Sequence, residues 1–277
     1  MKLINIFAIT LLLISSAATT FAQDFEEIKL PLSNPAEKGF LKVEIHKGPI
    51  TIKGTDRKDI LVRYAAMGKS KDKAKNKDRN KDIVKNKNGL KKLTSASIDL
   101  EISEHDNRVK INSDSWNQGL ILEIEVPKTI DLKVESYNHG DLEIDNIIGS
   151  LELTSYNGSI TATHISGSIV ADTYNGKITA TFDKVQADEP MAFINYNHGL
   201  DLTFPADIKA TFKISNKQGD VYTGFDMTME KQKIEKKETK QSYKIQLGKW
   251  VVGKVNGGGA EITMENYNGD IYIRKTE

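Results

Sequence analysis

Residues 137–181 read YNHGDLEIDNIIGSLELTSYNGSITATHISGSIVADTYNGKITAT, with glycine at every ninth position from Gly140 to Gly176. The five glycines are Gly140, Gly149, Gly158, Gly167 and Gly176. Two places after each stands Leu142, Leu151, Ile160, Ile169 or Ile178, and four places after each stands Ile144, Leu153, Ala162, Ala171 or Ala180. Apolar residues at alternate positions are typical of a strand with one buried face. The recurrence of this short strand predicts a repeat protein.

The turns between these expected strands share a Tyr-Asn-Gly or Tyr-Asn-His-Gly sequence. Asn-Gly suits a tight turn because both residues tolerate positive φ. In the intervening turns Ile147 and Ile165 stand two places before the glycine, where the neighbouring repeats have tyrosine, so the true period is eighteen residues. The residues assigned to structural turns are Gly140, Gly149, Gly158, Gly167, Gly176 and Gly269.

Two all-β folds fit this spacing. A unit of eighteen residues with two strands and two turns suits one coil of a solenoid, in which Leu142, Ile160 and Ile178 stack on one side. An antiparallel meander is the alternative, because Asn-Gly is also the strongest hairpin turn. Spacing alone leaves both open, but nine-residue units repeated over five turns favour the solenoid.

The rest of the chain extends this pattern. Residues 23–130 contain further alternating runs and are expected to form an N-terminal β region continuous with the solenoid, including a hairpin over 98–111. Residues 131–277 are expected to form the solenoid itself, and Ile262, Met264, Ile271 and Ile273 restore the nine-residue spacing at its end. Two lysine-rich segments, 69–92 and 229–240, are expected to be loops.

Residues 1–22 have the charged, apolar and small-residue regions of a secretory signal peptide. The mature chain, 23–277, is then expected to be exported to the periplasm, the cell surface or the extracellular space. No later segment has the ~20 apolar residues of a transmembrane helix. The chain has no cysteine, which excludes a disulfide framework, a thiolate metal site and a lipid-modified cysteine. Removing Lys2 leaves 38 basic and 38 acidic residues, so any electrostatic function is local.

The chain resembles the putative-adhesin family of secreted bacterial β-strand-repeat proteins, a domain of unknown function. The resemblance covers most of the mature chain. It lies in the Tyr-Asn-Gly turns, in Pro205-Ala206-Asp207 leading into 214–221, and in the ending from Asn256-Gly257-Gly258-Gly259 to 268–273. It implies a right-handed parallel β-helix or a β-roll-like solenoid, exported from the cytoplasm, with adhesion as an analogy.

The turn tyrosines are the candidate ligand-binding residues. They could form a ladder of aromatic faces that stack on sugar rings, with neighbouring asparagines hydrogen-bonding the ligand. The favoured alternative is that each tyrosine packs over the adjacent turn and stiffens the stack. The five positions are Tyr137, Tyr156, Tyr174, Tyr196 and Tyr267.

The sequence indicates no catalytic, cofactor or metal site. Calcium-binding β-rolls use a Gly-Gly-x-Gly-x-Asp repeat, whereas Ser159, Ser168 and Lys177 follow successive glycines here, leaving too few carboxylates for a hard cation. The five histidines lack metal-ligand spacing, and no serine, histidine and acid constellation or carboxylate pair can be identified. We therefore expect a protein that is not an enzyme.

The segment 69–92 carries eleven Lys or Arg and three Asp, and it could contact polyanions or be a solvated insertion. Nucleic acid is not an expected partner, because aromatic residues to stack bases are scarce there. The leading hypothesis is an adhesin-like binding module for envelope or host glycans or an envelope protein. A structural envelope scaffold or protein-partner platform is the alternative, and a polysaccharide-active β-helix enzyme is the least favoured.

Overall fold

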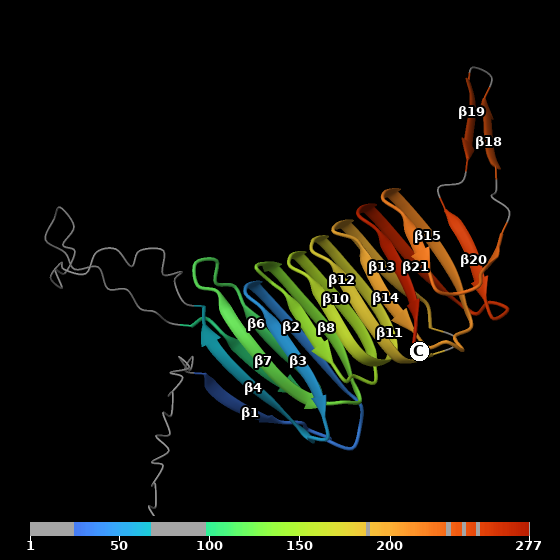
Figure 1. Cartoon of the computed structure of the whole chain (residues 1–277). Helices are drawn as coiled ribbons and strands as arrows, with labels where there is room; N and C mark the ends of the chain where they lie inside the picture. Colours follow the sequence, from blue (N-terminus) through green and yellow to red (C-terminus); the bar gives the residue numbers. More distant parts are fainter. Residues whose placement is uncertain are drawn as a thin grey trace, which may run out of the picture.

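The structure, a computed structural model, describes residues 25–67, 98–186, 189–230 and 250–276, and the backbone of 234–239 and 242–247. The expected signal peptide, 1–22, and the basic segment, 69–92, lie outside the described residues. The described chain is all-β: 20 strands form one hydrogen-bonded network, and two more form a separate pair (Figure 1). No helix that could cross a membrane occurs among the described residues.

The 20 strands lie in two rows that share β11 (Ile160–Asn175), whose beginning pairs in the second row and whose end pairs in the first. The first row, in spatial order, is β5 (Glu101–His105), β6 (Arg108–Ser113), β2 (Gly39–Lys47), β8 (Ile130–Asn138), β10 (Ser150–Asn157), β11, β13 (Met191–Asn197), β21 (Ala260–Asn268), β15 (Ala210–Gln218), β20 (Val251–Val255) and β17 (Thr228–Met229).

The second row is built in the same way. Its strands, in spatial order, are β1 (Glu26–Pro31), β4 (Asp59–Ala66), β7 (Leu120–Pro127), β3 (Ile50–Thr55), β9 (Leu142–Asp145), β11, β12 (Ile178–Val185), β14 (Leu200–Phe204), β22 (Ile271–Lys275) and β16 (Val221–Thr223). We call two strands joined by a glycine turn, one in each row, a rung; β8 and β9 form one such rung.

Neighbouring strands of the repeat pair in parallel. Leu151 pairs with Ile169 in the first row, and Ile160 pairs with both Leu142 and Ile178 in the second. Residues one eighteen-residue period apart therefore lie side by side, and the antiparallel meander does not describe the repeat. Antiparallel pairs within the network lie towards its two ends, where β5–β6 confirms the expected hairpin and β1, β4, β17 and β20 flank the outer rungs.

The spatial order of the rungs departs from the chain order at both ends. The last rung, β21–β22, lies between β13–β14 and β15–β16 (Figure 1). Near the N-terminus, β2–β3 lies between the strands β6 and β7 on one side and the rung β8–β9 on the other. The last rung of the chain and the early rung β2–β3 thus both lie in the interior of the stack. The final coil expected from Ile262, Met264, Ile271 and Ile273 is confirmed as a paired rung.

The apolar side chains of both rows form one buried cluster. In the regular part, Ala162, Ala171 and Ala180 are buried at the Gly+4 positions, so little space separates the rows there. Towards the C-terminal end Phe193 stands beside Ala171, and Phe182 stacks on Phe204 with ring centroids 5.0 Å apart. Full burial of one such side chain contributes roughly 1.5–3 kcal/mol.

The repeat glycines are required for a reason other than positive φ. Positive φ is found at Gly269 but at none of Gly140, Gly149, Gly158, Gly167 and Gly176. Instead, a Cβ on Gly158 would lie 2.4 Å from the carbonyl carbon of Gly140, and one on Gly176 would lie 2.0 Å from the carbonyl oxygen of Gly158. Successive rungs therefore approach too closely for a side chain. Gly167 lies inside β11, shortly after the bend at His164, which has φ 53°.

The lysine-rich segment 229–240 differs from the expected loop. It contains β18 (Ile234–Thr239), which pairs antiparallel with β19 (Ser242–Leu247) and with no other described strand. Only two residues separate the strands, and Tyr243, Ile245 and Leu247 alternate with polar residues, as is typical of a hairpin. Because the segment is rich in lysine, this alternation did not indicate a strand in the sequence.

Candidate binding surface

Strand alternation places the five turn tyrosines on the outer face of the first row. Each is the penultimate residue of its strand: Tyr137 in β8, Tyr156 in β10, Tyr174 in β11, Tyr196 in β13 and Tyr267 in β21. The residue before each tyrosine points inward and is buried. All five tyrosines keep 38–54% of their surface exposed, so the first row carries a line of exposed aromatic side chains, which we call the tyrosine strip.

Four of these tyrosines stack on one another. The centroids of Tyr156 and Tyr174 are 5.1 Å apart, and those of Tyr174 and Tyr196, and of Tyr196 and Tyr267, are each 4.6 Å apart. The ring planes differ by no more than 11° in any pair. Because Tyr174 and Tyr196 are covered on both faces, they present their edges and hydroxyl groups to solvent.

Tyr137 belongs to a different aromatic group. Its ring stacks on His46 with centroids 5.6 Å apart, and His46 in turn contacts Trp116 edge-on. Trp116 is 73% exposed, an unusual degree for a side chain of this size. His46 and Trp116 extend the tyrosine strip towards β2. No sequence pattern pointed to Trp116, because it lies in an irregular segment between β6 and β7.

An asparagine ladder runs beneath the tyrosine strip. The amide of Asn157 donates to Asn138, that of Asn175 donates to Asn157, that of Asn197 donates to Asn175, and that of Asn268 donates to Asn197, at 2.8–3.1 Å. Each asparagine between the ends therefore donates one bond and accepts another. Such a chain of half-buried hydrogen bonds ties five rungs together.

A second polar row is buried at the residue before each tyrosine. Ser155 donates to the carbonyl of Gly140 and Thr173 to that of Gly158, both at 2.9 Å, while Asn195 donates to the carbonyls of Gly176 and Gly199. These bonds satisfy turn carbonyls that would otherwise be buried without a partner. This polar row is visible in the sequence, because the residue before each of the five tyrosines is Ser, Thr or Asn.

Two grooves flank Asp172 along the tyrosine strip. One, of about 300 Å³, is lined by Glu135, Tyr137, Tyr156 and Tyr174, and the other, of about 270 Å³, by Tyr174, Ile194, Tyr196, Lys217, Glu265 and Tyr267. Asp172 lines both. Within the described chain its carboxylate has no ion-pair or hydrogen-bond partner, and partial burial raises its pKa above the ordinary value.

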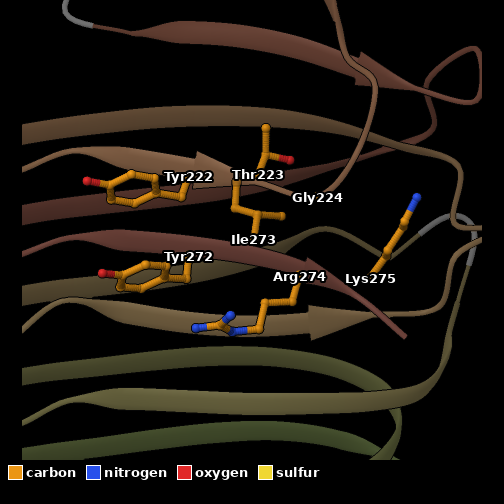
Figure 2. Close-up of a pocket in the computed structure, with 7 residues that line it drawn as sticks. All are labelled: Tyr222, Thr223, Gly224, Tyr272, Ile273, Arg274 and Lys275. Atoms are coloured by element: carbon orange, nitrogen blue, oxygen red, sulfur yellow. The ribbon is translucent and has the colours of Figure 1, made fainter. Parts of the chain in front are cut away.

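A separate hollow of about 440 Å³ lies on the second row, near the end of the stack. Figure 2 shows Tyr222 and Tyr272 side by side with their rings pointing the same way, and Arg274 next to Tyr272. The two rings stack with centroids 5.1 Å apart. Arg274 donates to Asp201 at 2.7 and 3.4 Å, and Lys177 pairs with the same carboxylate at 2.8 Å. Burial opposes ionisation of Asp201, but these two cations outweigh it and lower its pKa.

The histidines lie mainly at turns and bends. His139, His164 and His198 have positive φ, and the imidazole Nδ1 of His164 lies 2.8 Å from Asp145. That contact raises the pKa of His164, while hydrogen bonds from His164 and Thr163 lower the pKa of Asp145. Within the described part of the chain no three His, Asp or Glu side chains are arranged to hold a metal ion.

Comparison with known proteins supports the fold. No family model matches the chain, and neither does any curated protein. Among solved structures, a putative cell adhesion protein from Clostridium sporogenes ATCC 15579 has a TM-score of 0.52 and 13% identity, covering 91% of this chain and 100% of that one. A putative adhesin from Bacteroides fragilis NCTC 9343 has a TM-score of 0.32 and 10% identity, and the match covers 92% of this chain and 98% of that one. The first likeness shows a shared fold.

Proposed function

We propose that the protein is a non-enzymatic, exported binding module of the adhesin type, acting at the bacterial cell envelope or surface. The observation that carries the proposal is the tyrosine strip with the two grooves that meet at Asp172. It combines exposed aromatic surface with an unpaired carboxylate on a regular, hydrogen-bonded scaffold. Contiguous exposed apolar surface rimmed by polar residues is typical of interaction sites and ligand-binding grooves.

The fold gives independent support by analogy. The Clostridium sporogenes protein that shares the fold is named for cell adhesion, and the likeness extends over its whole chain. We interpret the two rows as a parallel solenoid of the β-helix type, with eighteen residues per coil in its regular part, because neighbouring rungs pair in parallel at that offset. Residues 23–130 would then continue the same solenoid, with β2 and β3 as one of its coils.

The ring geometry determines how the strip would bind. Tyr174 and Tyr196 are covered on both faces by neighbouring rings, so a glycan would be held through their hydroxyl groups and through Asp172. Hydrogen bonds of this kind confer specificity when polar groups are precisely placed along an apolar groove. Trp116, which is far more exposed, would supply an aromatic contact at the other end of the strip.

The test compares binding by residues 23–277 with binding by the triple variant Tyr156→Phe, Tyr174→Phe, Tyr196→Phe. Phenylalanine keeps the stacked rings and removes only the hydroxyl groups, so the fold is expected to survive. Both proteins are passed over immobilised envelope and host glycans and over intact cells at physiological salt. The proposal expects retention of the parent chain and its loss in the variant at an unchanged melting temperature. Equal retention of the two proteins would show that the hydroxyl groups of the tyrosine strip do not take part in ligand binding.

The basic segment needs its own control. A version lacking residues 69–92 is tested alongside, at low and at physiological salt. If binding is a polyanion contact made by this segment, it weakens sharply with salt and disappears on deletion. Retention that survives both changes assigns recognition to the folded stack.

One observation favours the second candidate function, a structural scaffold or partner platform in the envelope. The tyrosine rings and the asparagine amides contact one another, so they stiffen the stack whether or not a ligand binds. Capture of one envelope protein, with no glycan retained by the parent chain, would support the scaffold and contradict the adhesin proposal.

A further inference from the structure

The hollow beside Tyr222 is formed by a missing side chain. Tyr272 and Arg274 project from the outer face of β22, and Tyr222 projects beside Tyr272 from β16 (Figure 2). The next position, beside Arg274, is Gly224, whose N–H donates to the carbonyl of Ile273 at 2.9 Å. A Cβ on Gly224 would come no closer than 3.6 Å to any neighbour. The space over Gly224 is therefore open, and a larger side chain would fill it.

One wall of the hollow is held in a fixed position. The hydroxyl of Tyr222 donates to Asp220 at 3.3 Å, and that of Tyr272 donates to Asp270 at 3.1 Å. Tyr222 stacks on Tyr272 with one face, and among the described strands β16 pairs with β22 alone. No described ring covers the other face of Tyr222, and the residue is 49% exposed. This differs from Tyr174 and Tyr196, whose two faces are both covered.

The charged side chains that line the hollow, Arg274 and Lys275, are both cations. Arg274 is engaged by Asp201, whereas the Lys275 amino group has no carboxylate within ion-pair distance in the described part of the chain. Lys275 lines the hollow. An aromatic wall with one unpaired ammonium group suits a ring-shaped ligand that carries one negative charge.

We propose that this hollow binds a uronic acid residue of an acidic polysaccharide. The sugar ring lies over Gly224 with one edge towards Tyr222, and its carboxylate, at the opposite end, accepts hydrogen bonds from Lys275. The volume of about 440 Å³ lies in the range of small-ligand sites. The site lies on the second row and shares no residue with the tyrosine strip, so it does not rest on the function proposed above.

The test measures trigalacturonate binding to residues 23–277 by calorimetry, at physiological salt. Its methyl ester has the same rings without the charge and is the matched ligand. The expected loss for the ester, and for Lys275→Gln with the acid, is about tenfold, corresponding to one charge-assisted hydrogen bond. Gly224→Val is expected to abolish binding because it fills the hollow, whereas Gly224→Ala is expected to retain most of it.

Three results would overturn the proposal. They are the absence of trigalacturonate binding, equal affinity for acid and ester, and undiminished binding by a Gly224→Val variant whose melting temperature is unchanged. Dextran sulfate supplies a further arm: if it competes equally well in the parent chain and in Lys275→Gln, the interaction is general polyelectrolyte attraction. The triple tyrosine-to-phenylalanine variant should bind trigalacturonate normally, which separates this site from the tyrosine strip.

Discussion

Replacing Gly158 by alanine tests why glycine recurs in this chain. The added Cβ would lie 2.4 Å from the carbonyl carbon of Gly140, 2.5 Å from its oxygen and 2.7 Å from the nitrogen of Asp141. All three are backbone atoms, and hydrogen bonds between the same turns, such as Leu142 N–H to the carbonyl of Ser159 at 2.9 Å, oppose their separation. The clash cannot be relieved by turning one side chain.

The expected cost follows from two opposing effects. Overpacking of this kind costs about 1–3 kcal/mol, and we expect the upper end because backbone must move. Alanine also restricts the conformations of the unfolded chain, which stabilises the folded state by about 0.4–1 kcal/mol. The net loss is then about 2 kcal/mol. At ~2–4 °C per kcal/mol for a chain of this size, the melting temperature should fall by about 4–8 °C.

Two control variants separate the causes. Gly224→Ala adds a Cβ that meets nothing closer than 3.6 Å, so its stability should be unchanged or slightly higher. Gly257→Ala has no atom within 4 Å but a φ of +88°, so it should lose about 1–2 kcal/mol through backbone strain alone. Thermal unfolding by circular dichroism measures all three. An unchanged melting temperature for Gly158→Ala would refute the close-approach explanation of the repeat.

Three further predictions concern the asparagine ladder, the His164 contact and the last rung. Asn175→Ala breaks two ladder bonds and should cost about 2 kcal/mol in urea unfolding, whereas Asn268→Ala breaks one and should cost about 1 kcal/mol; equal costs would argue against the ladder. The raised pKa of His164 means that its contribution to stability is complete below the ordinary histidine pKa and is lost as pH rises through the raised value. For Asp145, whose pKa is lowered, the contribution is lost as pH falls through that lowered value; an NMR titration of His164 that Asp145→Asn leaves unaltered would contradict the pairing. Ending the chain after Gly259 removes β21 and β22 from between two other rungs and should abolish cooperative unfolding. Deleting 231–249 removes a hairpin that pairs with no other described strand and should leave the melting temperature close to that of the parent.

Much of the architecture could be predicted from local pattern. Leu142, Ile160 and Ile178 stand eighteen residues apart and pair side by side, because a fixed period places equivalent positions in register. The positive φ predicted from the Asn-Gly motif is found at Gly269 but is wrong for the five repeat glycines from Gly140 to Gly176, where close approach of the backbone excludes a side chain. Sequence patterns report local conformation, whereas contact between successive rungs depends on the packed stack.

The order of the rungs and the composition of the surface could not be predicted in this way. Nothing in the spacing shows that Met191 pairs with Ile262, because long-range pairing depends on where the chain returns. The tyrosines were found from their turns, but Trp116 and Asp172 were not, since each joins the strip only through strand neighbours. Gly224 and Lys275 likewise become neighbours only through the pairing of β16 with β22.

The most direct test of the central proposal measures binding and turnover together. Residues 23–277 are incubated with a panel of envelope and host glycans at physiological salt, and both the protein retained and the reducing ends released are quantified. The account predicts saturable retention on a subset of the panel without release of reducing ends. Release of reducing ends would identify an enzyme, and absence of retention on every glycan and on intact cells would contradict a binding module of the adhesin type.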